Sequence, residues 1–158
     1  MKAALIAATV FLLTSPHAGS VQRTLASVTA PSAQPLDTTF PTDSILGNWW
    51  SEGKEGLLKI VKTKAGLYEV VMVDGVDADK KDVKNPDPKL RDRTLRGIVI
   101  MWHLRFEDGE YVDGYCYNPR DGHTYRVKMK VTGPKSLTLR GYLLVPLLGQ
   151  SQDWTRAP

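Results

Sequence analysis

The sequence has a single cysteine, Cys116, among its 158 residues. No intramolecular disulfide can form, so the fold must be stabilised by its hydrophobic core. Long apolar runs are also scarce. One run of eleven residues, 3–13, is too short to cross a bilayer as a helix. No other run approaches membrane length, so the sequence predicts no integral membrane segment once this N-terminal run is removed.

The N-terminal run instead has the arrangement of a secretory signal. Lys2 precedes it, and small residues at 18–20 suit cleavage; a second candidate site at 28–30 is followed by proline. We expect residues 1–20 to be a signal peptide and the protein to be exported, to the periplasm or the extracellular space. Residues 21–43 are rich in Ser, Thr, Ala and Pro, which predicts a flexible leader.

Motifs for catalysis, metal binding and nucleic-acid binding are missing. His103 and His123 belong to no metal-binding pattern, and no G-x-S-x-G motif occurs. The densest basic stretch, residues 80–96, also contains aspartates, which favours a solvated loop over a phosphate-binding track. The sequence therefore predicts no enzyme activity, no metal or other cofactor, and no nucleic-acid partner.

Cys116 is better placed for packing than for chemistry. By strand parity it shares a face with Val112 and Gly114, so we expect it to be buried. A triad with Asp121 and His123 would need an exposed, ionised thiol. An enzyme built on Cys116, or on a pair of carboxylates, is the least favoured interpretation.

The rest of the sequence consists of short segments of alternating apolar and polar residues separated by turn residues. The clearest is 124–131, where one face is apolar and the other carries Thr, Arg and Lys. The predicted strands are residues 47–52, 57–62, 67–73, 97–106, 110–117, 124–131, 137–143 and 151–156. Their mostly short links predict an all-β, eight-stranded antiparallel up-and-down barrel over residues 44–158, with an open sandwich as the alternative.

The two ends of this domain carry residues suited to closing a barrel. Gly47 and Trp49 lie on the first predicted strand, and Trp154 and Arg156 lie on the last. A guanidinium group can lie on an indole face while its donors cap nearby carbonyls, which a lysine could not reproduce. We predict that Arg156 stacks on Trp49 where the first and last strands meet.

An eight-stranded barrel can enclose one small ligand. The side chains expected to line its interior are Trp102, Tyr125, Val127, Met129 and Leu139. The one long connection, residues 74–94, is predicted to form a lid at the barrel mouth. Its Arg91 and Arg93 would then meet a carboxylate head group of the ligand. The alternative for this connection is a solvated loop paired to its own aspartates.

Several blocks of the sequence resemble the domain-of-unknown-function family twenty-one forty-seven, a family of small exported bacterial proteins. The matching blocks run in order from Ile45 to Arg156 and include Gly47-Asn48-Trp49, Asn85-Pro86-Asp87-Pro88, Gly114-Tyr115-Cys116-Tyr117-Asn118-Pro119, Arg140-Gly141-Tyr142 and Gln152-Asp153-Trp154-Thr155-Arg156. The resemblance implies a lipocalin-like barrel and an exported protein, and it implies no established activity. The family's cysteine pair at the second hairpin is absent here, and Asn118 replaces the aspartate of its Tyr-Asp-Pro turn.

Together these features predict an exported barrel that binds a small, partly apolar or lipid-like molecule without covalent chemistry. The alternative is a cell-envelope or host-surface interaction protein whose barrel is filled by its own side chains and holds no ligand. A thermal-shift screen with lipids would separate the two, because a ligand stabilises only the protein that binds it.

Overall fold

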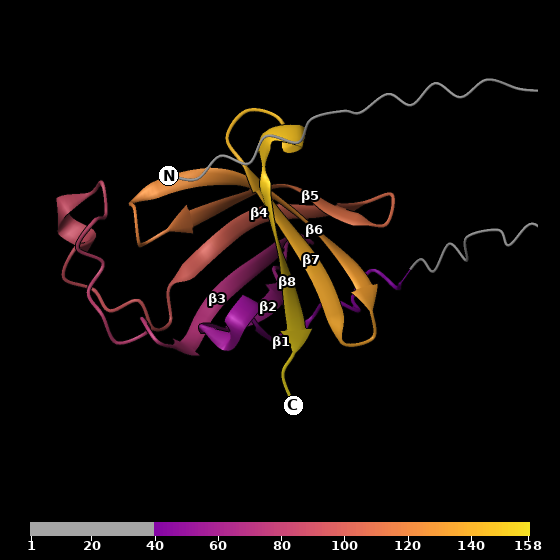
Figure 1. Cartoon of the computed structure of the whole chain (residues 1–158), viewed down its shortest axis with the longest axis horizontal. Coiled ribbons are helices and arrows are strands. Elements are labelled where there is room, and N and C mark those ends of the chain that lie inside the picture. Colours follow the sequence, from indigo (N-terminus) through magenta and orange to yellow (C-terminus); the bar gives the residue numbers. More distant parts are fainter. Residues whose placement is uncertain (1–39) are drawn as a thin grey trace, which may run out of the picture. The chain divides into compact units, whose positions relative to one another are not determined.

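Eight β-strands form a closed antiparallel barrel in a computed structural model that describes residues 40–158 (Figure 1). Each strand pairs with its neighbours in the sequence, and β1 pairs with β8. The strands are β1 (Gly47–Trp50), β2 (Gly56–Lys62), β3 (Tyr68–Gly75), β4 (Val99–Glu107), β5 (Glu110–Asn118), β6 (His123–Gly133), β7 (Ser136–Tyr142) and β8 (Gln150–Arg156). The predicted up-and-down barrel is confirmed, and the alternative of an open sandwich is wrong.

The predicted signal peptide and most of the predicted flexible leader lie outside the described residues. Within residues 40–158, none of the helical segments has the length and hydropathy of a bilayer-spanning helix. These segments are single 3-10 turns: η1 (Glu52–Lys54), η2 (Pro88–Leu90) and η3 (Pro146–Leu148).

The two ends of the barrel differ in their connections. Short turns join β2 to β3, β4 to β5 and β6 to β7 at one end, which we call the closed end. The β1–β2, β3–β4, β5–β6 and β7–β8 connections lie at the other, which we call the open end. The β3–β4 connection is the longest, and Figure 1 shows it extending away from the strands on one side.

Residues 40–46 cover the closed end. Ile45 is fully buried, and Phe40 packs against the core. The hydroxyls of Tyr68 and Tyr111 donate hydrogen bonds to the carbonyl of Thr42, at 3.1 and 2.5 Å. Residues 40–43 therefore belong to the barrel domain, and the predicted extent of the leader to residue 43 is wrong. Within the predicted leader, Phe40 packs against the core and the Thr42 carbonyl accepts hydrogen bonds from the barrel.

The predicted closure pair is confirmed. Trp49 and Arg156 are partners in the β1–β8 register, and the guanidinium carbon lies 4.2 Å from the centroid of the indole ring. At Gly47, φ is 115° and an added Cβ would lie 3.2 Å from a guanidinium nitrogen, so a side chain there would be strained and crowded. The same guanidinium donates to three backbone carbonyls, those of Ser44, Leu46 and Pro134.

Two irregular residues change which side chains face the barrel interior. His103 in β4 and Asp113 in β5 have left-handed φ values of 62° and 59°, and the β5–β6 register shifts between Tyr111 and Gly114. Tyr111 and Gly114 both face inward, so Val112 faces outward. The predicted shared face of Val112 and Cys116 is therefore wrong, because the irregularity at Asp113 breaks the alternation that the prediction assumed.

Candidate functional site

A cavity of about 720 Å³ occupies the open end of the barrel. Its inner wall is made mainly by apolar side chains from six of the strands. These are Leu58, Ile100, Met101, Cys116, Val127, Leu139 and Trp154. Cavities of this size and lining suit a small molecule with a substantial apolar part.

Two inward-facing glycines mark where the barrel changes from packed to hollow. A Cβ added at Gly114 would lie 2.5 Å from Leu104 and 2.9 Å from Val127, so the interior is closely packed there. Gly141 is the register partner of Val127, yet a Cβ added to it would meet nothing within 4 Å. The residue at 141 thus leaves open space that a larger side chain would occupy.

The cavity mouth has polar groups on the β5–β6 turn. Asp121 accepts hydrogen bonds from the Tyr125 hydroxyl and the Asn118 amide, both at 2.8 Å. Burial acts to raise the pKa of Asp121, but hydrogen bonds from the His123 backbone and from Tyr125 hold this pKa below its ordinary value. The carboxylate is therefore ionised at neutral pH and can accept hydrogen bonds from a ligand.

The mouth is more acidic than basic. Glu52 and Glu55 join Asp121 at the rim, and Arg120 is the sole cation among the described residues that line the cavity. The Arg120 guanidinium is already engaged, at 2.8 Å from Glu55 and 2.8 Å from Asp77. A ligand with a neutral or cationic polar group is therefore better matched to this mouth than a ligand with a carboxylate.

The structure distributes the predicted lining residues over three environments. Tyr125, Val127 and Leu139 line the cavity. Met129 is buried in the packed core and does not reach it. Trp102 lies on the outer face, stacked on Tyr115 with ring centroids 6.0 Å apart.

The prediction that Trp102 lines the interior is wrong for a local reason. Met101 and Leu104 both face inward because His103, which lies between Trp102 and Leu104, has left-handed backbone geometry and breaks the alternation. Strict alternation cannot anticipate such an insertion. Trp154, predicted as a closure residue, also lines the cavity. Leu58 lines it too and was not predicted, although its alternation with Lys59 was a signal that could have identified it.

The predicted lid is also wrong. No residue between 74 and 98 lines the cavity. The connection packs beside the mouth instead: the Val76 backbone donates to the Glu55 carbonyl at 2.9 Å, and Lys84 Nζ donates to the Arg120 carbonyl at 2.7 Å. It is tied to the neighbouring turns rather than laid across the opening.

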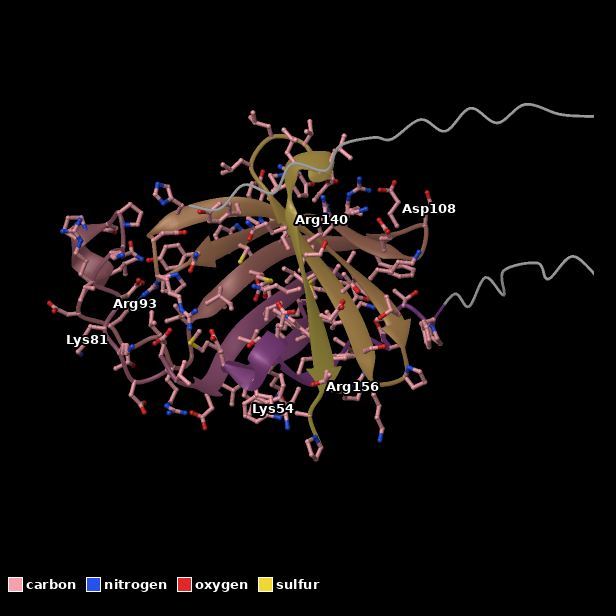
Figure 2. The ribbon with its side chains drawn as sticks, in the orientation of Figure 1. Lys54, Lys81, Arg93, Asp108, Arg140 and Arg156 are labelled. Carbon is pink, nitrogen blue, oxygen red and sulfur yellow. The ribbon has the colours of Figure 1, made fainter. Side chains whose placement is uncertain are left out.

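Arg91 and Arg93 serve the structure of this connection and do not reach a ligand in the cavity. Arg93 donates to the buried Asp82 at 2.9 and 3.1 Å, and Arg91 donates to the Asn85 carbonyl at 2.8 Å. Figure 2 shows Arg93 within the β3–β4 connection, away from the barrel interior. The alternative weighed from the sequence, pairing with the connection's own aspartates, holds for Arg93.

Cys116 is half-buried in the cavity wall rather than fully buried. Among the described residues, its sulfur has one hydrogen-bond acceptor, the Tyr117 carbonyl at 3.8 Å, and no contact to a base. Burial raises the pKa of the thiol to about 12. The thiol is therefore a neutral part of the cavity wall at neutral pH.

We expect a thiol reagent to label Cys116 slowly in the native protein and fast in urea. The rise in pKa from an ordinary value of 9.0 to about 12 lowers the thiolate fraction at neutral pH by about a thousandfold. The time course of labelling by a chromogenic disulfide, recorded with and without urea, measures the ratio of the two labelling rates. Equal rates in the two states would contradict the assignment and would favour the enzyme alternative.

Comparisons with known proteins agree with this architecture. A solved structure described as "Protein HP1028 from the human pathogen Helicobacter pylori belongs to the lipocalin family" is similar, with a TM-score of 0.65 and 26% sequence identity, over 72% of this chain and 82% of that one. No curated protein matches. The sequence model of the family described as "Uncharacterized protein conserved in bacteria (DUF2147)" matches residues 47–156, from the closure residue Gly47 to its partner Arg156. These residues build the whole barrel, and the chain belongs to that family.

Proposed function

We propose that the protein is an exported, non-catalytic binding protein whose barrel holds one small, partly apolar molecule. The observation that carries this proposal is the cavity of about 720 Å³ with an apolar inner wall and a polar mouth. A lipocalin-like fold supports it, because eight-stranded barrels of this kind can hold a single small ligand. The alternative of a barrel filled by its own side chains lacks support, since the open end is hollow.

The chemistry of the cavity defines the class of ligand. The apolar part would lie against Leu58, Val127 and Leu139, where it removes apolar surface from water. The polar part would remain at the mouth, within reach of Asp121 and the neighbouring amide of Asn118. We expect a neutral or cationic amphiphile to bind better than a carboxylate, which revises the acidic head group suggested by Arg91 and Arg93.

Replacing Gly141 by phenylalanine should weaken this binding strongly. The ring would enter space in which a Cβ meets nothing within 4 Å, so it fills the cavity without forcing the barrel apart. We expect at least a tenfold weaker affinity for the neutral fluorescent probe Nile red, about 1.4 kcal/mol or more in binding free energy. Dodecanol and dodecylamine should displace the probe from the unaltered protein more effectively than dodecanoate.

Lys130→Phe is the matched control, because Lys130 lies exposed on the outer face of β6 and makes no contact with the cavity. This variant should bind Nile red as the unaltered protein does. Thermal unfolding of both variants checks that the barrel is intact. Unchanged probe affinity in a folded Gly141→Phe variant would show that the cavity is not the binding site.

A further inference from the structure

The β7–β8 connection exposes an unusual amount of apolar surface. Its residues 143–149, which we call the apolar loop, include five aliphatic side chains that face solvent. Their exposed fractions are 68% for Leu143, 86% for Leu144, 47% for Val145, 86% for Leu147 and 78% for Leu148. Soluble monomers seldom leave such side chains contiguous and uncovered unless they contact a partner or a membrane.

The apolar loop is tied to the barrel by hydrogen bonds and a close backbone contact. The Arg140 guanidinium donates to the carbonyls of Pro146 and Leu147 and to the Ser151 hydroxyl. The loop also folds tightly onto β7, because a Cβ added at Gly149 would lie 2.3 Å from the Gly141 carbonyl. Figure 2 shows Arg140 beside this loop, at the end of the barrel opposite Arg156. These contacts fix the backbone of the loop so that its leucines face solvent.

The position of the apolar loop links it to the cavity. Leu143, Leu144 and Leu148 line the mouth on one side and are exposed on the other. Figure 1 shows the loop projecting beyond the strands where β7 ends and β8 begins. Whatever covers the loop therefore also lies against the opening of the barrel.

The order of side chains along the loop matches the layers of a lipid bilayer. Residues 141–149 contain no charged side chain, and their tip is wholly aliphatic. Tyr142 and Arg140 lie at its base, where aromatic and cationic side chains favour the level of the carbonyl and phosphate groups. The partners of the Arg140 guanidinium are two carbonyls and a hydroxyl, and none is a carboxylate among the described residues, so no side chain neutralises its positive charge, which can attract an anionic head group.

Backbone hydrogen bonding also favours a lipid bilayer, rather than a protein partner, as the surface that covers the loop. The carbonyls of Pro146 and Leu147, which would otherwise be costly to bring near hydrocarbon, are already satisfied by Arg140. Protein interfaces typically add aromatic or arginine anchors and hydrogen bonds at their centre, and the tip of this loop offers neither. We propose that the apolar loop docks the open end of the barrel on a lipid bilayer.

Docking of this kind goes beyond the proposed function, although it would give an apolar ligand a path from the bilayer into the cavity without crossing water. That second consequence rests on the proposed function. The docking itself does not, because it needs only the exposed leucines and the base of the loop. The two can be separated by measuring vesicle binding and probe binding on the same variants.

The test is flotation of the protein, purified after processing in the cell, with vesicles of phosphatidylethanolamine and phosphatidylglycerol. Leu147→Glu places a charge at the most exposed part of the loop without touching the cavity wall. We expect its vesicle affinity to fall at least tenfold while Nile red binding without vesicles is unchanged. Val83→Glu is the matched control, since Val83 is 65% exposed on the β3–β4 connection, and it should float like the unaltered protein.

Three outcomes would overturn the proposal. One is vesicle binding by Leu147→Glu as tight as that of the unaltered protein. Another is an equal loss in Val83→Glu, which would indicate a general charge effect. The third is a protein that ignores vesicles and forms a dimer in sedimentation that Leu147→Glu disrupts, because the loop would then bind a second copy of the chain. The Gly141→Phe variant should float with vesicles as the unaltered protein does. The vesicle test therefore remains decisive even if the cavity binds no ligand.

Discussion

Replacing Trp49 by alanine is expected to lower the free energy of unfolding by about 3–5 kcal/mol, as for other large buried aromatic residues. Trp49 is fully buried, and its indole N–H donates to the Ile45 carbonyl at 2.7 Å. The substitution removes this packing at the junction of β1 and β8 and takes away the surface on which Arg156 lies. Equilibrium unfolding in urea, followed by circular dichroism, measures the loss.

Arg156→Ala tests the other half of the same junction, with an expected loss of about 2–4 kcal/mol because several hydrogen bonds and the stacked contact disappear together. The carbonyls of Ser44, Leu46 and Pro134 would lose their donor. Arg156→Lys is the informative control: it keeps the charge but lacks the planar, multiply donating group, so it should recover little of the stability. Full recovery by lysine would show that charge alone closes the barrel.

Replacing Asp82 by alanine is expected to destabilise the protein by about 3 kcal/mol, the lower end for breaking a buried ion pair, because Arg93 is partly hydrated. Asp82 is fully buried and accepts hydrogen bonds from Arg93, Asn85 and Tyr117. Burial raises the pKa of Tyr117 to about 12, so its hydroxyl remains a donor at neutral pH. The variant leaves all three donors without their common acceptor.

The loss should be concentrated in the β3–β4 connection, whose shape depends on this carboxylate. Hydrogen exchange should become faster at residues 76–98 and change little in β6 and β7. Asp82→Asn keeps the size and one acceptor oxygen, so it should fall between alanine and the unaltered protein. A variant without Asp82 that retains both stability and slow exchange in this connection would contradict the assigned role.

Local patterns were sufficient to predict the barrel. Alternation from Tyr125 to Val131 specifies one buried face, and turn residues such as Asn118-Pro119 separate the strands at short intervals. The closure pair was predictable too, because Trp49 and Arg156 have a contact chemistry that few other residues share. The strands depend only on residues close in sequence. The closure pair depends on the fact that a closed barrel must join its first strand to its last.

The lining of the cavity was only partly predictable. Tyr125, Val127 and Leu139 follow the alternation and line it, whereas Trp102 is displaced to the outer face by the backbone at His103. A bulge depends on how two strands pair, and no pattern within β4 announces it. Asp82 is a similar case: pairing with Arg93 in the same connection was foreseeable, but the hydrogen bond from Tyr117 on β5 comes from a distant part of the chain.

By itself the sequence determined the class of fold, the order of the strands and the residues that close the barrel, because period-two alternation and turn chemistry act over a few residues. The tertiary structure decided where the barrel is hollow, which side chains face the cavity, and that the long connection lies beside the mouth. These features follow from contacts between distant segments, such as the open space at Gly141 and the bonds from Arg140 that present the apolar loop.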